Sequence, residues 1–366
     1  MKHSLRTTVA AAVGLLGVAV SGTAFGAECS AENWKACKGK AWVDGDVMET
    51  PLGSKWWPNP MWGKDDEAGS TNWYLKPDVI ARAMGANAGK GKVYKLGHPY
   101  TATMPLFGAR KFSLRTPVPT GVVDGLGGNK VTWNDEFLAT EVGQVGTQFD
   151  GLGHIGVTMG APGEEGKMVW YNGFTAAQMA NAYGLNKLGT EKLHPIIARG
   201  ILIDLAGARG VESMEAGEVA TMADVRKALK RQGMENFKFQ EGDAILFRYG
   251  WEKYWIVDNA KYNNGCPGVG MDVARWIAEE VKAGVTGGDT WPATDPVPGK
   301  GTKNEVPAGC IFCVHNYLQT RHGIVNQENL KLKALADAGV YTFMYVYSPV
   351  PIKGATGSIG VPVAIY

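Results

Sequence analysis

The segment QVGTQFDGLGH, residues 144–154, brings together side chains that could do chemistry. It places two amides, one carboxylate and one imidazole at even-numbered positions, namely Gln144, Gln148, Asp150 and His154. Residues of equal parity face the same side of an extended strand, so we predict that these four line one face. The surrounding glycines predict a bend after Asp150 that curls His154 back over its neighbours. Nitrogen and oxygen donors would then meet in a small volume.

Two interpretations of this cluster are open from the residues alone. Carboxylate and amide oxygens suit a divalent cation, and an imidazole can transfer a proton. Spacing is weak evidence, however, and in an arbitrary sequence a hydrogen-bonded polar core is the commoner outcome. Near the C-terminus, VHNYLQTRHGIVNQENL adds His315 and Glu328. The run ENLKLKAL predicts a helix, in whose first turn Glu328 would also be favourable.

The other polar candidates have structural alternatives. His98 and His194 each precede a proline, which predicts extended backbone and a packing role. For His322 we favour a surface or packing role over ligation. Asp289 ends a predicted strand, where it could orient a metal ligand or cap a turn. The sequence contains no G-x-S-x-G segment, which argues against a serine hydrolase.

The first 26 residues have the pattern of a cleavable export signal. Lys2 and Arg6 precede an apolar run, and Ala24-Phe25-Gly26 suits signal peptidase. We therefore expect a periplasmic or secreted protein with no membrane contact after cleavage. Without Lys2 and Arg6 the 37 basic residues fall to 35, which equals the 35 acidic residues. A near-neutral chain argues against nucleic acid as a partner.

The remaining chain is predicted to be one α/β domain, residues 76–366, after an irregular Trp-rich N-terminal arm, residues 27–75. Helical spacing and caps predict helices over 76–88, 174–188, 221–233, 271–284 and 326–339. Apolar runs predict strands over 92–100, 198–207, 241–251, 283–290 and 340–350. A further strand should enter the segment 144–154 after a turn at Asn134–Asp135.

Five cysteines occur, and an oxidising compartment would permit disulfides. Cys29 and Cys37 close a short loop, and we expect them to pair. Cys310 and Cys313 form a C-x-x-C segment without the βαβ context of a redox motif, so we favour a structural bridge that could involve Cys266. A zinc knuckle is not expected, because a second C-x-x-C is missing.

The segment 144–154 resembles the H-x-G-T-H-x-D-x-P-x-H signature of the cyclase family of metal-dependent hydrolases. That family includes bacterial kynurenine formamidases, isatin hydrolases and trans-dienelactone hydrolases. Further similar segments follow in the family's order across residues 62–360: ARGILIDL, EGDAILFRYGW, CPGVGMDVARWIAEE, GVTGGDT and VHNYLQTRHGIVNQENL. Gln144 and Gln148 stand where the signature has histidine, and Leu152 stands where it has proline.

The resemblance implies a fold, a site and an activity. The fold would be a central, mixed, β-barrel-like sheet flanked by helices, in a homodimer or higher homo-oligomer. By position, Gln144, Gln148 and Asp150 would form one metal shell, and His315 and Glu328 would be the C-terminal ligands. His154 would be the catalytic base, and Phe107 would contact substrate.

The activity implied is hydrolysis of an amide or ester bond in a small cyclic or aromatic compound by metal-activated water. The metal would be manganese or zinc, with manganese favoured because amide oxygens replace imidazoles. Alternatives are a periplasmic small-molecule binding protein that has lost its metal, or a metal-dependent lyase on the same scaffold. Labelled oxygen from water in the product would separate hydrolysis from the lyase reaction.

Overall fold

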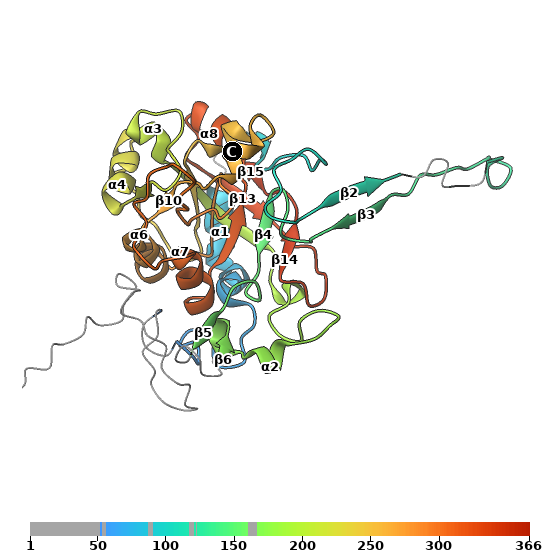
Figure 1. Ribbon diagram of the computed structural model, residues 1–366, viewed down its shortest axis with the longest axis horizontal. Coiled ribbons are helices and arrows are strands. Elements are labelled where there is room, and N and C mark those ends of the chain that lie inside the picture. The colour runs from blue at the N-terminus through green and yellow to red at the C-terminus, as the bar shows by residue number, and fades with distance from the viewer. Residues whose placement is uncertain (1–51, 53–55, 87–90, 117–120, 122, 160–166) are drawn as a thin grey trace, which may run out of the picture.

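The fold is built around one mixed sheet of nine strands that curls into a half-barrel and is flanked by helices (Figure 1). The structure is a computed structural model, and it describes residues 52, 56–86, 91–116, 121, 123–159 and 167–366. The predicted fold class is confirmed. The export signal 1–26 and the pair Cys29 and Cys37 lie outside the described residues, and the domain limits stay predictions.

Fifteen strands and eight α-helices are defined within the described residues. The strands are β1 (Val93–Lys95), β2 (Phe112–Arg115), β3 (Phe137–Thr140), β4 (Gln148–Asp150), β5 (Val157–Met159), β6 (Lys167–Val169), β7 (Ile196–Asp204), β8 (Val219–Ala220), β9 (Ala244–Arg248), β10 (Gly268–Val269), β11 (Val285–Gly288), β12 (Val325–Glu328), β13 (Thr342–Tyr347), β14 (Gly357–Ile359) and β15 (Val363–Ile365). The helices are α1 (Pro77–Gly85), α2 (Ala176–Met179), α3 (Leu205–Arg209), α4 (Met222–Arg231), α5 (Asn259–Asn263), α6 (Met271–Arg275), α7 (Cys313–His315) and α8 (Lys333–Asp337). Two π-helical segments, η6 (Trp276–Val281) and η7 (Asn316–Arg321), continue α6 and α7.

The large sheet has the order β1-β15-β13-β7-β9-β11-β12-β4-β14. Its four central neighbours β7, β9, β11 and β12 are parallel, whereas the strands on either side of them pair antiparallel. The parallel strands therefore end at one edge of the sheet, which is where α/β proteins commonly place their functional residues.

The parallel centre is apolar on both faces. Ile201 and Ile203 of β7 pack into one core, while Leu202 between them packs into the other. The first core includes Val225 of α4, and the second includes Val79 of α1. A strand covered on both faces has no solvent-facing side, which explains its continuous apolar sequence.

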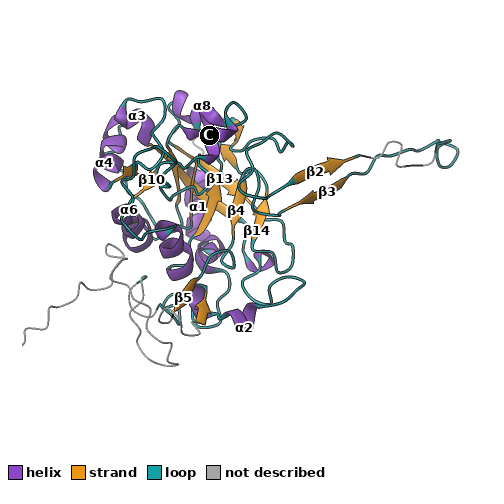
Figure 2. Cartoon of the chain, viewed as in Figure 1, coloured by secondary structure: helices purple, strands orange, loops and turns teal. Residues whose placement is uncertain are grey.

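Helix α4 shows why the local predictions succeed. Its Thr221 and Asp224 form a capping box at the N-terminus, and Gly233 adopts φ +70° just beyond the C-terminus. These caps satisfy free backbone groups at the two ends, so the sequence specifies both boundaries. Cartoon colouring shows α3, α4 and α6 gathered on one side of the sheet (Figure 2).

Two local predictions are wrong. The predicted helix over 326–339 is strand β12 up to Glu328, and only Lys333–Asp337 forms a helix. Residues 325–328 join the sheet because β11 and β4 offer backbone partners on both sides, and that tertiary pairing overrides a helical pattern. No turn is assigned at Asn134–Asp135; the assigned turn between β2 and β3 nearest to them lies at residues 127–130.

Strands β2 and β3 form a hairpin that extends far from the body of the molecule (Figure 1). We call residues 111–141 the projecting hairpin. Its two ends return to the body close to β4 and β14 (Figure 1). Among the described residues, no helix is both long and apolar enough to cross a membrane.

Candidate metal and active site

Gln148 and Asp150 lie on β4 with their side chains on one face, as parity predicts, and Phe149 packs into the core behind them. The neighbouring strand β12 pairs Glu328 with Gln148 and Asn326 with Asp150. Cross-strand partners share a face, so two carboxylates and two amides meet there.

Gln144 does not lie in this strand. It precedes β4 in a loop where Gly143 and Gly146 adopt φ +76° and +64°. A Cβ on Gly143 would lie 2.3 Å from the carbonyl carbon of Gly357, and left-handed backbone disfavours other residues there. The glycines thus bend the chain before Gln148 as well as after Asp150, where the N–H of His154 donates to the Gly151 carbonyl at 3.1 Å.

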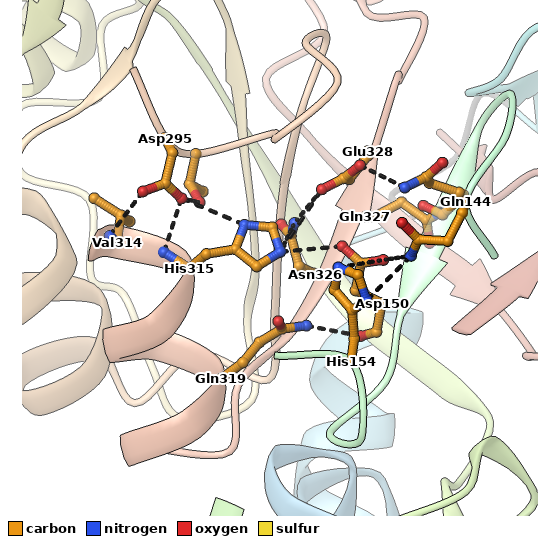
Figure 3. Close-up of polar contacts among 12 residues, drawn as sticks. Gln144, Asp150, His154, Asp295, Val314, His315, Gln319, Asn326, Gln327 and Glu328 are labelled. Carbon is orange, nitrogen blue, oxygen red and sulfur yellow. Dashed lines mark hydrogen bonds and ion pairs between the residues drawn. The ribbon is translucent and has the colours of Figure 1, made fainter. Parts of the chain in front are cut away.

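Asp150 is the centre of the cluster and is fully buried. Its Oδ1 accepts a hydrogen bond from Gln144 Nε2 at 3.1 Å, and its Oδ2 lies 3.1 Å from His315 Nε2 (Figure 3). Its backbone carbonyl accepts from Gln319 at 3.0 Å. One carboxylate therefore joins the segment 144–154 to the distant helix α7.

His315 lies between two buried carboxylates. Besides Asp150, its Nδ1 is 3.3 Å from Oδ2 of Asp295. Asp295 also accepts the backbone N–H groups of Val314 and His315, both at 2.8 Å (Figure 3). Asp295 fixes both the start of α7 and the ring it carries, as carboxylates beside metal-binding histidines do.

Glu328 completes the cluster from the end of β12. Its Oε2 accepts from Gln148 Nε2 at 2.6 Å, and its Oε1 accepts from Asn326 at 3.2 Å. The same Oε1 lies 3.7 Å from His315 Nε2. The sequence predicted Glu328 in the first turn of a helix, but the residue ends a strand instead. That position brings its carboxylate close to Asp150 and His315.

Burial and charge move the pKa values of this cluster apart. Burial raises the pKa of Glu328 well above its usual range, and the charge of Asp150 raises it further. Burial also tends to raise the pKa of Asp150, but attraction to His154 and contacts with His315 outweigh it and lower the pKa. For His315 burial lowers the pKa, yet contacts with Asp150 and Asp295 raise it well above the usual value. Such opposed shifts within one cluster are typical of functional sites.

His154 is the most accessible imidazole of the group, with 28% of its side chain exposed. Its Nδ1 is 3.2 Å from Gln144 Nε2, and its Nε2 is 4.0 Å from Asp150 Oδ1. Burial of the ring is the main reason that its pKa is lowered. The imidazole lies at the boundary between the buried carboxylates and open space.

That space is a cavity of about 260 Å³. Five of the six predicted catalytic and metal-binding residues line it, and the sixth, Asp150, lies beneath them. The predicted substrate contact Phe107 also lines the cavity. The remaining lining residues were not predicted from the sequence: Arg110, Ile155, Trp291, Pro292 and Phe312. Phe107 stacks on Trp291 with ring centroids 4.4 Å apart. The cavity therefore has polar groups at its base and aromatic walls, an arrangement typical of small-molecule sites.

Arg110 is the functional candidate that the sequence did not reveal. Its Nη2 donates to Gln144 Oε1 at 2.9 Å, and its guanidinium lies 5.5 Å from the Phe107 ring centroid. Its only sequence signal is a position near Phe107, which is too common a neighbourhood to single out an arginine. Asp295 was not predicted either, because it lies in an irregular segment without a periodic pattern.

Other sequence candidates have structural roles. Asp289 accepts the backbone N–H groups of Tyr249 and Gly250 at 2.7 and 2.8 Å, which is a capping role. His98 stacks on Trp255 with centroids 4.4 Å apart. His322 borders a different cavity of about 340 Å³ that contains none of the predicted ligands.

The structure also shows which of the three C-terminal cysteines are paired. Cys310 and Cys313 form a disulfide, and Cys266 is free and buried. The bridge therefore does not involve Cys266. It brackets Phe312, a wall of the cavity, immediately before the helix that carries His315.

The donor set fits a divalent cation. Ligand atoms of Asp150, His154 and His315 all lie within 4.8 Å of one another. One carboxylate and two imidazoles suit zinc or manganese. Gln144 and Gln148 direct their amide nitrogens at carboxylates, so in this conformation they hold Asp150 and Glu328 in place. Their role as ligands stays a prediction.

Comparison with known proteins assigns the family. The model of the family described as "Putative cyclase" matches residues 94–296, more than half of the chain. This chain belongs to the cyclase family. The matched range contains Arg110, Asp150, His154 and Asp295, whereas His315 and Glu328 lie beyond it.

Solved structures agree with the cyclase fold. The crystal structure of a novel cyclase is 27% identical, covers 83% of this chain and 98% of its own, and superposes with a TM-score of 0.69. Isatin hydrolase A from Ralstonia solanacearum is 17% identical, covering 78% of this chain and 95% of its own, with a TM-score of 0.51. An isatin hydrolase bound to the product analogue thioisatinate is 18% identical. It covers 80% of this chain and 100% of its own, with a TM-score of 0.51. No curated protein gives a significant match.

Proposed function

We propose that this cyclase-family protein is a metal-dependent hydrolase that opens an amide or ester bond in a small cyclic or aromatic compound. One observation carries the proposal: Asp150, His154 and His315 converge at the base of an aromatic-walled cavity. The similarity in fold to isatin hydrolases supports a planar substrate of this kind. Manganese or zinc would be the metal.

The cavity walls would hold a planar substrate. Phe107, Trp291 and Phe312 line the cavity, so they offer ring faces or edges to an aromatic substrate. The Arg110 guanidinium would donate to a carbonyl or carboxylate oxygen of the substrate, because arginine presents several fixed donors. The same guanidinium holds Gln144, which in turn holds Asp150.

Asp150 and His315 would hold the cation, with Glu328 beside them. When bound, a divalent cation would polarise the scissile carbonyl and lower the pKa of water towards neutrality. Asp295 would keep the His315 ring oriented, and burial behind the sheet would exclude bulk water from the carboxylates. His154, which faces the cavity, would accept a proton from the attacking water and pass it to the leaving nitrogen or oxygen.

The decisive experiment combines metal analysis with turnover. The purified chain should carry a divalent metal and should hydrolyse one member of a panel of N-formyl aromatics, lactams and lactones, with oxygen from labelled water in the product. Product without the label would favour the lyase. His154→Ala should abolish turnover and keep most of the metal. Loss of the metal together with turnover would make His154 a ligand, and near-normal turnover would remove it from the mechanism.

A metal-free binding protein is the second candidate. Its support is that the cluster satisfies itself without a cation, through Gln148 to Glu328 and Gln144 to Asp150. Tight binding of small aromatics by the apo protein, with no turnover in any metal, would establish it. We further propose export and self-association, as the sequence predicts.

A further inference from the structure

A second cavity, of about 340 Å³, has no part in the proposed reaction. Among the described residues, none lines both this cavity and the candidate active site. Its volume is within the range of small-molecule sites. We call it the tryptophan cavity, because its lining includes Trp56, Trp62 and Trp73.

Segments far apart in the sequence enclose the tryptophan cavity, and buried hydrogen bonds hold them together. Ser70 lies in the 3-10 helix η2 (Gly69–Leu75) and lines the cavity. Its backbone N–H donates to the Gly323 carbonyl at 2.8 Å, and its Oγ donates to the Gly284 carbonyl at 2.6 Å. One residue thus ties the N-terminal wall to the chain that follows η6 and to the chain that follows η7. The cavity is a fixed feature of the fold.

The walls of this cavity are largely aromatic. Trp56 and Trp73 are buried, and Trp62 lies edge-on to Trp73 with the ring centroids 5.0 Å apart. Aromatic rings pack favourably against such surfaces, through both buried area and ring-to-ring contact. The walls therefore favour a ligand that carries an aromatic ring.

The charged residues among the described lining are both basic, namely Lys282 and Arg321. Lys282 Nζ also lies 3.2 Å from Glu241, but both side chains are partly exposed, so that ion pair is weak. Lys76 adds a third cation beside the wall, with its Nζ 4.0 Å from the Trp73 ring centroid. Positive charge without a lining carboxylate favours an anionic ligand over a cationic one.

Two lining residues also carry a buried nitrogen that has no hydrogen-bond partner in the described part of the chain: Trp56 Nε1 and His322 Nε2. Burial and the charge of Arg321 lower the pKa of His322 to about 3, so its ring is neutral at pH 7. Buried polar atoms are seldom left unpaired. The indole N–H can only donate, so an acceptor oxygen on a ligand would satisfy it.

We propose that the tryptophan cavity is a binding site for a small aromatic carboxylate, separate from the candidate active site. The ring would lie against Trp56 and Trp73, and the carboxylate would face Arg321 and Lys282. A guanidinium can hold a carboxylate through two parallel hydrogen bonds. Binding at this site needs no turnover, so its test is independent of the proposed function.

The first test is calorimetric titration of the purified full chain with naphthalene-2-carboxylate. We expect saturable binding, and we expect naphthalene-2-carboxamide, which keeps the rings but lacks the charge, to bind at least about ten-fold more weakly, or roughly 1.4 kcal/mol. Absence of binding by the carboxylate overturns the proposal, and so does equal affinity for the amide.

The second test locates the probe. Arg321→Met should weaken a binding component at least about ten-fold, whereas Arg110→Met, the matched change in the other cavity, should leave that component unchanged. Binding weakened only by Arg110→Met would place the probe in the candidate active site and overturn the proposal.

A third variant tests the wall without changing charge. Ala278 lines the tryptophan cavity and is buried, so Ala278→Leu should reduce the space for the rings and weaken binding. Circular dichroism should show that each variant is folded. If Arg321→Met does not fold, Lys282→Met and Ala278→Leu replace it, and wild-type affinity in both overturns the proposal.

Discussion

Two buried aspartates at the ends of sheet strands have opposite surroundings. Asp204 ends β7, where its Oδ1 accepts from Arg248 at 2.6 Å and its Oδ2 from Arg231 at 3.2 Å. It also caps α3 through the Gly207 N–H at 3.1 Å. Its partners are permanent cations and a backbone group, so this carboxylate is tied into the fold.

Asp150 ends β4, where its partners are two imidazoles and an amide, and a cavity opens above it. Imidazoles exchange protons near neutral pH, whereas guanidinium groups do not. The comparison shows that burial of an acid does not indicate function by itself. The kind of partner, imidazole or guanidinium, and the presence of space for a ligand distinguish the two sites.

The largest expected effect is on chemistry at Asp150. Asp150→Asn removes the carboxylate that joins the segment 144–154 to His315, so we expect turnover to fall by at least about 10³-fold. Metal content measured by elemental analysis should fall with it. An Asp150→Asn enzyme with wild-type turnover and metal would place the site elsewhere.

Asp204 should behave in the opposite way. Asp204→Asn leaves Arg248 buried without its carboxylate, and we expect the free energy of unfolding to fall by about 3–5 kcal/mol in urea titrations. Metal affinity of the folded fraction should be unchanged. Asp337→Asn is the control, because its ion pair with Lys333 is exposed and should contribute no more than about 1 kcal/mol. Equal losses of unfolding free energy from Asp204→Asn and Asp337→Asn would contradict a structural role for Asp204.

The histidines also differ between a structural position, His98, and the candidate site. Burial against Trp255, aided by Lys331, lowers the pKa of His98 to about 4, whereas an unfolded histidine titrates near 6.5. The unfolded chain therefore binds this proton first, so the stability from His98 is present above about pH 6.5 and is lost as pH falls towards 4.

His98→Asn should remove that dependence. Between pH 7 and pH 4 its free energy of unfolding should fall less than that of the wild type, by up to about 3 kcal/mol. Urea titrations at several pH values measure the difference. Parallel pH profiles for the two proteins would show that His98 is not the titrating group.

The smallest expected effect is at the wall of the cavity. Arg110→Met keeps the apolar stem but removes the donor to Gln144, so we expect turnover to fall about ten-fold with metal content unchanged. Lys111→Met, on the adjacent exposed position, should have no effect on turnover. Loss of metal from Arg110→Met would mean that Arg110 acts through Asp150 alone.

Patterns of short range were enough to predict much of this protein. Compact apolar runs predicted β7, β9 and β11, helical spacing with caps predicted α4, and parity predicted the shared face of Gln148 and Asp150. These features depend on neighbours within a few residues, so the sequence contains all the information they need. Family resemblance added His315 and Glu328 to the candidate site.

Contacts between distant segments were decided by the tertiary structure alone. His315 lies 165 residues from Asp150 in the chain, and only the placement of α7 against β4 brings their side chains to 3.1 Å. Asp295 and Arg110 belong to segments without any periodic pattern, so their roles depend on what folds around them. Residues 325–328 form a strand because β4 and β11 lie on either side, and no local propensity can report which strands will be neighbours.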